Sequence, residues 1–502
     1  MNIIIRADTS TQIGTGHVMR CLALAQAWQD AKVQPIFVMA TSQPALEKRL
    51  KLEEIEVVKI KATPGSTADA EETAALAHQF GVSWVVVDGY HFQAEYQKII
   101  KDSELSLLFF DDYGHAKYYW ADVVLNQNIY ADQALYLNRE PYTKLLLSTK
   151  YVLLRREFWQ WQGWQRQISP VARNFLVTLG GADADNVTLK VIHALQQTKI
   201  DNLEVVVVIG GSNPHYEQLQ KTVEKSQVSI RLARNVTNMP ELIAWADIAI
   251  AAGGTTSWEL AFMGLPSILM ILADNQRAIA EKLDELGIAV NLGWHEDVSI
   301  AKIAEKIIAV SGMIQPTLKM RTEMSQRAQK LVDGEGSSRV LLHLNSQKLR
   351  LRLVREVDCK LLWEWINEAT VRAASFSSDP IPWETHVAWF KSKLNSPNCI
   401  FYIALNKDDL PIGAIRYDIE NHEAVISVNI DSKFRQQGYG SYLINLASQK
   451  LFHTININKI NAYIKPINQA SIGAFIKSGF QQIGTTSVKG QVAIHFVKQR
   501  ST

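Results

Sequence analysis

Two segments, one near each end of the chain, share a local pattern: a short apolar strand, a glycine-containing loop and a helical pattern. The first runs from Ile3–Arg6 into Gly14-Thr15-Gly16-His17-Val18-Met19-Arg20, and the second from Val425–Ile430 into Arg435-Gln436-Gln437-Gly438-Tyr439-Gly440. Such a loop presents backbone N–H groups and the positive end of a helix dipole to a phosphate. The surrounding patterns differ, so the sequence predicts two nucleotide-handling enzymes of different chemistry fused in one chain.

The composition is that of an ordinary folded enzyme. With 502 residues, 47% apolar and 20% charged, the chain is expected to form roughly three domains at ~150 residues each. A net charge of +2 gives no reason to expect nucleic acid or a membrane as partner, and no apolar run approaches the ~20 residues of a membrane helix. The widely spaced Cys21, Cys359 and Cys399 provide neither a disulfide framework nor a zinc motif. This cysteine usage predicts the reducing cytoplasm as the protein's location. Met1–Arg6 reads as a strand rather than a signal peptide, and we expect a soluble protein.

The first two-thirds of the chain alternate short apolar segments with longer helical patterns, which is typical of parallel sheets with crossover helices. The expected strands of a first series are Asn2–Arg6, Gln34–Met39, Trp84–Val87, Leu107–Phe110 and Val123–Leu125, with helices at Gly16–Ala31, Gln43–Lys51 and Ala68–Phe80. A second series, after the Trp-rich segment Phe158–Trp164, comprises Asn174–Thr178, Glu204–Ile209, Ser229–Leu232, Ile248–Ala251 and Ser267–Met270. These patterns predict an α/β fold of two doubly wound domains, residues 1–165 and 166–345, with a cleft between them.

A third domain, residues 350–502, is expected after a helix at Ser337–Leu344 and a polar connector at Asn345–Leu349. Its helices are expected at Trp363–Asn367 and Thr385–Leu394, and its antiparallel strands at Cys399–Leu405, Pro411–Asp418 and Ala424–Ile430. This pattern predicts an α+β domain of usual size.

His17 directly follows the first glycine turn, where a strand gives way to a helix. Open α/β sheets bind ligands in the crevice at such carboxyl ends of strands. A histidine there can take a proton from water near neutral pH. Position alone equally allows a histidine that only packs or caps the start of a helix.

A second glycine loop follows the predicted strand Asp247–Ala252. Gly253-Gly254-Thr255-Thr256-Ser257 opens a helix, which makes an anion cradle, and Glu259 lies one turn into it, close enough to hold ribose hydroxyls. The alternative is a plain glycine turn in which Thr and Ser cap the helix.

These residues resemble the GT-B glycosyltransferase-like family, and particularly the UDP-sugar hydrolases of pseudaminic acid biosynthesis. The matching residues are Gly14-Thr15-Gly16-His17 with Arg20, Asp88-Gly89-Tyr90, Gly180-Gly181-Ala182-Asp183, Gly253-Gly254-Thr255-Thr256-Ser257 through Glu259, and Asn275-Gln276. The resemblance implies that UDP binds the second lobe and the sugar lies against the first. It also implies that His17 activates water for inverting attack on the anomeric carbon.

Acidic residues near these motifs have two interpretations. Asp88 could orient His17 or bind a sugar hydroxyl, with Tyr90 facing the same cleft, but aspartates at strand ends are often turn residues. Asp111-Asp112 has the same ambiguity. Asp183-Ala184-Asp185 formally reads Asp-x-Asp, which some transferases use to hold a metal; we favour helix capping and predict no metal. The departing diphosphate would then be stabilised by backbone donors and the helix dipole at Gly253–Ser257.

The glycine loop near the C-terminal end of the chain, from Arg435 to Gly440, resembles the pyrophosphate loop of the GNAT acetyltransferases. Arg435, Gln436, Gln437, Gly438, Tyr439 and Gly440 precede a helix at Ser441–Leu451, and a strand at Asn461–Ile464 leads to Asn468, Ser471, Phe475 and Gly479-Phe480. A lone glycine cap is the alternative for the loop, but the two halves of the pattern occur together from Leu351 onwards. The resemblance implies acetyl-CoA as co-substrate.

Acetyl transfer to an amine requires a deprotonated amine, a polarised thioester and a proton for the leaving thiolate. In this family the thioester carbonyl usually meets a backbone N–H of a splayed strand, here near Val428–Ile430. Many members place a tyrosine four residues before the Gly-Phe pair as general acid. This chain has Phe475 there, which leaves Ser471, Asn468 or a water as candidates.

The acceptor pocket is expected near Trp383-Glu384-Thr385-His386 with Trp389-Phe390, where an aromatic wall would suit a 6-deoxy sugar. Packing of Trp389 and Phe390 in the core is equally compatible with the helical pattern. His386, Glu384 and Glu423 are candidates for substrate contact or for the base.

The combination of domains has its own implication. The third domain is similar to acetyltransferases that act on a 4-amino UDP-sugar of the same pathway, whose product is the hydrolase's substrate. One chain would then acetylate the sugar and release UDP. The alternatives are a glycosyltransferase that moves the sugar to an acceptor, and a third domain that only binds coenzyme A. The sugar configuration, the oligomeric state, the placement of the domains and any channelling stay open.

Overall fold

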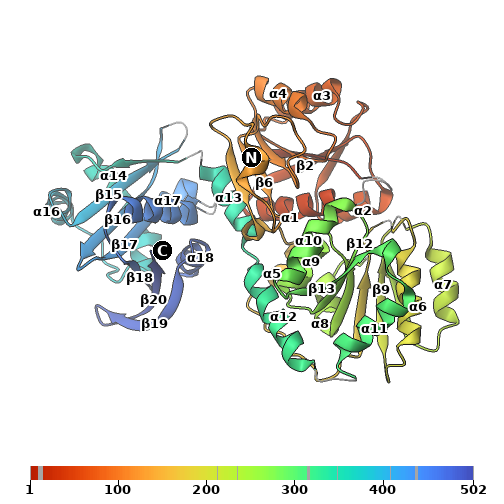
Figure 1. The fold of residues 1–502 in the computed structure, drawn as a ribbon. Helices are drawn as coiled ribbons and strands as arrows, with labels where there is room; N and C mark the ends of the chain where they lie inside the picture. The colour runs from red at the N-terminus through yellow and green to blue at the C-terminus, as the bar shows by residue number, and fades with distance from the viewer. Residues whose placement is uncertain are drawn as a thin grey trace. The chain divides into compact units, whose positions relative to one another are not determined.

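A computed structural model of the chain describes residues 2–9, 15–181, 183–211, 213–234, 236–313, 317–346, 349–406, 409–435 and 439–500. The structure divides into two compact units, Met1–Ser337 and Ser338–Thr502 (Figure 1). The first unit holds two parallel sheets with crossover helices, and the second holds one mixed sheet. No helix in the described part of the chain is long and apolar enough to cross a membrane.

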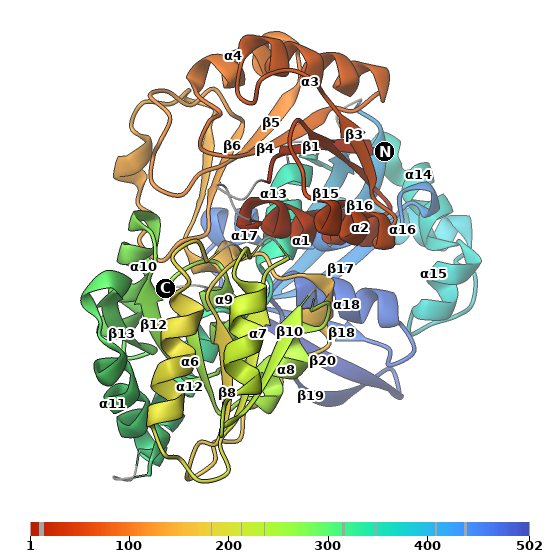
Figure 2. The ribbon, with the colours of Figure 1, turned by 90° about the vertical axis from the view of Figure 1, so that its right-hand side faces the viewer.

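The first sheet has seven parallel strands in the order β3-β2-β1-β4-β5-β6-β7. Its strands are β1 (Asn2–Ala7), β2 (Gln34–Met39), β3 (Glu56–Lys59), β4 (Trp84–Asp88), β5 (Ser106–Phe110), β6 (Val123–Asn126) and β7 (Lys144–Leu147). Its helices are α1 (Gly16–Asp30), α2 (Pro44–Leu52), α3 (Thr67–Gln79) and α4 (Ala94–Asp102), followed by the short η1 (Gln133–Tyr136), η2 (Thr149–Tyr151) and α5 (Arg156–Trp159). Figures 1 and 2 show α3 and α4 on one face of this sheet and α1 on the other.

The second sheet has six parallel strands in the order β10-β9-β8-β11-β12-β13. Its strands are β8 (Asn174–Thr178), β9 (Glu204–Ile209), β10 (Ser229–Arg234), β11 (Ile248–Ala252), β12 (Ser267–Ile271) and β13 (Ala289–Trp294). Its helices are α6 (Val187–Gln197), α7 (Tyr216–Glu224), α8 (Met239–Trp245), α9 (Thr256–Phe262), α10 (Asp274–Glu285), α11 (Ile300–Ser311) and α12 (Leu318–Leu331), with η3 at His295–Asp297. Apolar cores cover both faces of this sheet, as a parallel sheet requires.

The second unit carries a seven-stranded sheet in the order β14-β15-β16-β17-β18-β20-β19, antiparallel except between β17 and β18. Its strands are β14 (Arg350–Leu353), β15 (Cys399–Leu405), β16 (Pro411–Glu420), β17 (Glu423–Ile430), β18 (Lys459–Ile464), β19 (Gln481–Val488) and β20 (Gln491–Gln499). Its helices are α13 (Gly336–Ser346), α14 (Cys359–Ile366), α15 (Ala369–Ala374), α16 (Trp383–Leu394), α17 (Tyr439–Thr454) and α18 (Gln469–Lys477), with η4 (Glu356–Asp358) and η5 (Ser432–Phe434). Side chains of α14 and α16 pack on one face, and those of α17 and α18 on the other.

This architecture confirms the predicted pair of α/β sheets followed by an α+β domain. Six strands lay outside the prediction: β3, β7, β13, β14, β19 and β20. Five of these are edge strands of their sheets, and the sixth, β20, lies next to the edge strand β19. Such strands have no need of a strong apolar pattern, and every residue of β19 except the last is exposed.

Candidate functional site

The catalytic candidates of the first sheet lie where its strand order reverses. β1 pairs with β2 on one side and with β4 on the other, and α1 begins soon after β1 at Gly16. Asp88 is the last residue of β4, and His17 lies in the first turn of α1. Doubly wound sheets bind ligands at this type of crevice. Gly14 lies outside the described residues.

His17, Arg20 and Asp88 form a compact group with little exposed surface. His17 Nδ1 lies 2.6 Å from Asp88 Oδ1, and Arg20 donates to both Asp88 oxygens, from Nε at 2.6 Å and from Nη2 at 2.7 Å. A bidentate arginine holds a carboxylate in a fixed orientation. The Asp88 carboxylate is therefore positioned to orient the His17 imidazole.

The contact also determines which imidazole nitrogen carries the proton. Burial alone would raise the pKa of Asp88, but the Arg20 guanidinium and His17 outweigh burial and hold that pKa well below its usual range. An ionised carboxylate only accepts hydrogen bonds, so Nδ1 of His17 donates. Arg20 Nη2, 3.2 Å from Nδ1, is a donor as well and cannot accept the Nδ1 hydrogen; it donates to Asp88 Oδ1. The Nε2 lone pair of neutral His17 then remains free to take a proton from water.

A second carboxylate extends this group. Arg20 Nη1 donates to Asp112 Oδ1 at 2.8 Å, and Tyr90 donates its hydroxyl hydrogen to Asp112 Oδ2 at 2.7 Å. Asn128 Nδ2 also donates to Asp112 Oδ1. Burial and the Asp112 charge raise the pKa of Tyr90, so its hydroxyl stays protonated. The His17 and Tyr90 rings meet edge to face at 4.8 Å.

Gly89, between Asp88 and Tyr90, has a backbone conformation that other residues rarely adopt, with φ of 155°. A Cβ at this position would lie 2.8 Å from His91 Cε1 and 3.0 Å from Phe92 Cε2. The glycine therefore permits the tight turn that places Asp88 and Tyr90 on the same crevice.

Several polar residues of this crevice were missed or given little weight in the sequence analysis. Asp112 and Asn128 follow β5 and β6 at the same edge of the sheet, and Asp8 follows β1. Arg6 Nη2 pairs with Asp8 Oδ2 at 2.7 Å, and His91 Nε2 lies 3.4 Å from the same oxygen. Their common signal is a polar residue one or two positions after a buried strand, which also describes ordinary turns.

In the second sheet the strand order reverses between β8 and β11. Gly180 and Gly181 follow β8, and Gly253–Thr255 lie between β11 and α9. A Cβ on Gly253 would lie 3.0 Å from the Gln276 carbonyl oxygen, whereas a Cβ on Gly254 would meet no described atom within 4 Å. The backbone is thus closely packed at Gly253 and open at Gly254.

Residues of the two sheets of the first unit meet at this place. A Cβ on Gly16 would lie 3.6 Å from Thr255 Oγ1, and one on Gly181 would lie 3.1 Å from Thr15 Oγ1. Asn275 Nδ2, at the start of α10, donates to the Tyr90 hydroxyl at 3.2 Å. The glycine loops at Gly180-Gly181 and at Gly253-Gly254 therefore border the same crevice as His17.

Other residues of the second lobe that were predicted to bind substrate form ion pairs or hydrogen bonds with neighbouring residues of the protein. Glu259 Oε1 pairs with Arg155 Nη1 at 2.6 Å, and burial raises the pKa of Glu259. Gln276 Oε1 accepts from the Leu272 N–H, and Ser257 Oγ donates to the Ala252 carbonyl. Thr255, the N-cap residue of α9, makes no side-chain capping bond to the helix.

Asp183 caps α6: its oxygens accept from the N–H groups of Val187 and Thr188 at 2.8 and 2.9 Å. This confirms the capping interpretation for Asp183. The described residues contain no group of three or more His, Cys, Asp or Glu side chains that could hold a metal ion.

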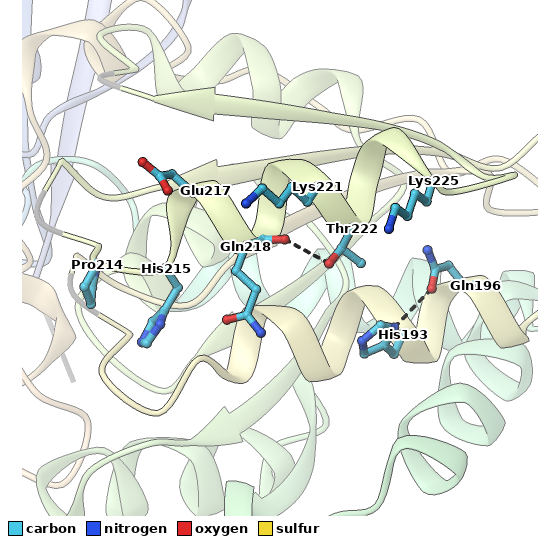
Figure 3. A pocket seen from close by; sticks show the side chains of 9 residues that line it. All are labelled: His193, Gln196, Pro214, His215, Glu217, Gln218, Lys221, Thr222 and Lys225. Atoms are coloured by element: carbon cyan, nitrogen blue, oxygen red, sulfur yellow. Dashed lines mark hydrogen bonds between the residues drawn. The ribbon is translucent and has the colours of Figure 1, made fainter.

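A groove between α6 and α7 lies on the outer surface of the second lobe (Figure 3). It is lined by His193, Gln196, Pro214, His215, Glu217, Gln218, Lys221, Thr222 and Lys225. Two side-chain hydrogen bonds are formed among these residues, each within one helix: Thr222 donates to the Gln218 carbonyl in α7, and His193 bonds to Gln196 in α6. None of the catalytic candidates lines this groove.

In the second unit, β17 and β18 pair only at their first three residues and then separate. The paired residues are Glu423 with Lys459, Ala424 with Ile460 and Val425 with Asn461, although β17 continues to Ile430. Val428 and Ile430 continue the pairing with β16 on the other side. The sheet thus opens beside Val428–Ile430, where the thioester was expected.

Arg435 and Gly440, two of the residues expected to bind coenzyme A, lie beside this opening. Gln436, Gln437 and Gly438 lie outside the described residues. Arg435 donates from Nε to the Ile430 carbonyl at 2.8 Å, from Nη1 to Thr370 Oγ1, and pairs through Nη2 with Glu368. Tyr439 and Gly440 begin α17, and a Cβ on Gly440 would lie 3.8 Å from Ile430 Cγ1.

The remaining candidates on α18 have structural contacts. Asn468 Oδ1 accepts from the Ser471 N–H and caps the helix, whereas Phe475 packs in the core, edge to face with Phe480 at 5.0 Å. The buried Phe475 ring has no polar group, so it cannot donate a proton to the leaving thiolate.

His386 is buried rather than open to a pocket, with 1% of its surface exposed. It makes a hydrogen bond to the Cys359 carbonyl, and burial lowers its pKa. Phe390 is buried as well, and Trp389 packs against the same cluster, which confirms the core interpretation of these two residues. The buried His386 is therefore a packing residue, contrary to the expectation that it contacts the substrate.

Comparison with known proteins finds similar regions in both units. Residues 175–334 match the glycosyltransferase family 28 C-terminal domain, and residues 348–481 match the acetyltransferase (GNAT) domain. A UDP-2,4-diacetamido-2,4,6-trideoxy-beta-L-altropyranose hydrolase of Campylobacter jejuni is 26% identical over 58% of this chain and 98% of its own. The spore coat polysaccharide biosynthesis protein SpsG of Bacillus subtilis is 26% identical over 68% of this chain and 96% of its own.

A further relative matches nearly the whole length of the chain. An uncharacterized protein of Methanocaldococcus jannaschii, MJ1062, is 24% identical over 96% of this chain and 97% of its own. The chain is a fusion of a region homologous to UDP-diacetamido-trideoxy-altropyranose hydrolases with a C-terminal GNAT domain. The resemblances found in the sequence are thereby confirmed.

Proposed function

We propose that this chain is a bifunctional nucleotide-sugar enzyme. Its GNAT domain transfers an acetyl group from acetyl-CoA to the 4-amino group of a UDP-2-acetamido-4-amino-2,4,6-trideoxy sugar. Its first unit then hydrolyses the product with inversion, releasing UDP and 2,4-diacetamido-2,4,6-trideoxy-L-altrose. The observation that carries the hydrolytic half is the 2.6 Å contact between His17 and Asp88 at the crevice of the first sheet.

In the hydrolytic step, His17 Nε2 takes a proton from water, and the hydroxide attacks the anomeric carbon of the sugar. The bond between that carbon and the diphosphate oxygen breaks, and UDP leaves. Asp88 stabilises the imidazolium that forms, as a buried carboxylate does in other histidine-based hydrolases. The Gly253–Thr256 backbone would meet the diphosphate charge, and Tyr90 and Asn275 would bind sugar hydroxyls or amides.

The roles of the other predicted substrate contacts follow from this arrangement. Gly180 and Gly181 permit close approach of the diphosphate, and Gln276 and Asp183 hold the surrounding backbone. Glu259 would reach the ribose only after exchanging its contact with Arg155. We therefore propose Glu259 as a ribose contact whose charge Arg155 balances in the absence of UDP.

In the acetyl-transfer step, the acceptor amine attacks the thioester carbon, and coenzyme A leaves as the thiol. The loop from Arg435 to Gly440 would bind the pyrophosphate of coenzyme A. The backbone of β17 at Val428–Ile430, open where β18 separates, would polarise the carbonyl.

A glycosyltransferase that moves the sugar to an acceptor is the second candidate, favoured by the family 28 match at residues 175–334. The test is to incubate the purified protein with the diacetamido UDP-sugar in ¹⁸O-labelled water, without an acceptor. We expect UDP release with one ¹⁸O atom in the sugar. Release that requires an added acceptor, or ¹⁸O in the phosphate of UDP, would contradict the hydrolase proposal.

A further inference from the structure

Four side chains form a group at the point where β17 and β18 separate: Glu423 on β17, Asn461 and Tyr463 on β18, and His495 on β20. Asn461 belongs to the last pair between β17 and β18, opposite Val425. Tyr463, two residues further along, is paired with His495 on β20. Figure 1 shows these three strands next to one another.

A chain of hydrogen bonds joins three of these side chains. Asn461 Nδ2 donates to Glu423 Oε2 at 3.0 Å, and Asn461 Oδ1 lies 2.9 Å from His495 Nε2. Lys459 Nζ lies 2.8 Å from Glu423 Oε1, and its hydrogen bond lowers the pKa of Glu423, so this carboxyl group is ionised. An ionised carboxylate only accepts, which requires the Asn461 amide to direct its NH₂ group to Glu423 and its oxygen to His495.

This orientation determines the tautomer of His495. Because Asn461 Oδ1 can only accept, Nε2 of His495 carries the hydrogen, and the lone pair of the neutral ring is on Nδ1. Within the described part of the chain, no hydrogen bond to Nδ1 is formed. The Tyr463 ring stacks on the imidazole at 4.7 Å.

The surroundings favour the neutral, proton-accepting form of His495. Burial lowers the pKa of the imidazole, and the nearby Lys459 lowers it further, while Glu423 opposes both. Lys459 and Glu423 are the charged groups that act on the ring from the neighbouring strands. The ring is only partly buried, so a substrate can reach it.

The register places this group opposite the expected site of coenzyme A. Side chains alternate along each strand, so Glu423, Asn461, Tyr463 and His495 share the face on which α14 and α16 pack. α17, which begins at the coenzyme A loop, packs on the other face, against Ala424, Ile460 and Ala462. The opening between β17 and β18 connects the faces, so an amine beside His495 and a thioester beside α17 would meet there.

We propose that His495 is the general base of the acetyl transfer, with Asn461 and Glu423 as positioning residues; this rests on the acetyl-transfer function proposed above. His495 Nδ1 takes a proton from the acceptor ammonium, and the neutral amine forms the C–N bond to the thioester carbon. The C–S bond breaks, the nitrogen loses its second proton, and the thiolate takes up a proton to leave as coenzyme A thiol. The net reaction releases one proton.

The test compares His495→Gln with wild type and with His453→Gln, a control at an exposed histidine of α17. With the 4-amino UDP-sugar and acetyl-CoA, we expect kcat for coenzyme A release to fall about 10²- to 10⁴-fold in His495→Gln, the usual contribution of a general base. The KM for acetyl-CoA should change less than twofold, and the acidic limb of the pH profile should disappear. UDP release from the pre-acetylated sugar should be unchanged, which shows that the variant is folded.

Glu423→Gln tests the positioning role, because a glutamine no longer requires the Asn461 amide to present its oxygen to His495. We expect a smaller loss of kcat, about tenfold, and a shift of the acidic limb rather than its loss. Wild-type kcat and pH profile in His495→Gln would overturn the proposal.

A measurement without substrate separates this inference from the proposed function. In ¹⁵N-histidine NMR of the full chain, we expect the His495 signal, identified by its loss in His495→Gln, to show the tautomer protonated at Nε2. A proton on Nδ1 at neutral pH would overturn the base assignment. If the wild type does not acetylate the 4-amino UDP-sugar, the proposed substrate fails, and the NMR result still decides the state of His495.

Discussion

Asp88 Oδ1 and His17 Nδ1 lie 2.6 Å apart, although the two residues are 71 positions apart in the sequence. The contact joins the end of β4 to the first turn of α1, beside β1 and β4, the neighbouring strands at which the strand order of the first sheet reverses. A general base is thereby oriented by a buried carboxylate in the crevice where doubly wound sheets bind ligands. The predictions below test this arrangement and its independence from the acetyltransferase.

His17→Asn removes the proposed base while keeping a side chain of similar size. We expect UDP release to fall by about 10²- to 10⁴-fold, the usual contribution of general base catalysis, and acetylation to remain at the wild-type rate. Steady-state assays of the two products on the same preparation check this. His78→Asn, at an exposed histidine of α3, is the matched control. Equal loss of both activities in His17→Asn would refute the assignment of two separate sites.

Asp88→Asn tests the orienting role. An asparagine can present its NH₂ group to Nδ1, which would move the imidazole proton to Nε2 and leave no lone pair for water. We expect UDP release to fall nearly as far as in His17→Asn, with the KM for the UDP-sugar changed much less than kcat. A variant that loses affinity but keeps kcat would show that Asp88 binds sugar instead of orienting the base.

The low pKa of Asp88 predicts how stability changes in acid. The pKa in the folded protein is below the unfolded value of about 3.9, so ionised Asp88 contributes stability above that pH and loses it as the pH falls towards the folded pKa. Breaking a buried ion pair costs about 3–5 kcal/mol. We therefore expect Asp88→Asn to lower the melting temperature of the first unit at pH 7, and the difference from wild type to shrink towards pH 3.

Asp102→Asn is the control for this experiment, because Asp102 forms an exposed pair with Lys98. Exposed pairs contribute about 0–1 kcal/mol, so its melting temperature should follow the wild type at both pH values. Calorimetry of the full chain measures both variants. A constant difference between Asp88→Asn and wild type from pH 7 to pH 3 would contradict the ionised, stabilising state of Asp88.

Gly440→Phe tests the coenzyme A loop. The Cβ position is 3.8 Å from Ile430 Cγ1, an ordinary contact, so Gly440→Ala should fold and serve as the matched control. The phenyl ring is expected to fill the space beside the loop and to weaken acetyl-CoA binding at least tenfold in calorimetric titration. UDP release from the acetylated sugar should be unchanged. Undiminished acetyl-CoA binding would place the cofactor elsewhere.

Much of this arrangement could be predicted from the sequence because buried parallel strands and glycine loops leave strong local patterns. Arg20, Asp88 and Tyr90 lie close to His17 in the structure, as expected from the sequence. The catalytic and binding roles of these residues remain predictions. Gly14, Gln436, Gln437 and Gly438 lie outside the described residues.

Other features could not be predicted, because they depend on which strands become neighbours. β19 is almost fully exposed, and nothing in the local sequence of β20 indicated that His495 would lie beside Asn461. Similarly, the buried position of His386 arises from the packing of α14 against α16, whereas the local sequence is equally compatible with a pocket wall. The partner of Glu259, Arg155, comes from the segment between the two sheets and carries no motif.

The most direct test of the account is product analysis of the purified chain supplied with the 4-amino UDP-sugar and acetyl-CoA, without a sugar acceptor. Mass spectrometry would follow the acetylated nucleotide sugar and UDP, and NMR at early times would give the anomeric configuration of the free sugar. The account predicts a free diacetamido sugar with inverted configuration, together with UDP and coenzyme A. Accumulation of the acetylated nucleotide sugar without UDP release would contradict it and favour transfer to a missing acceptor.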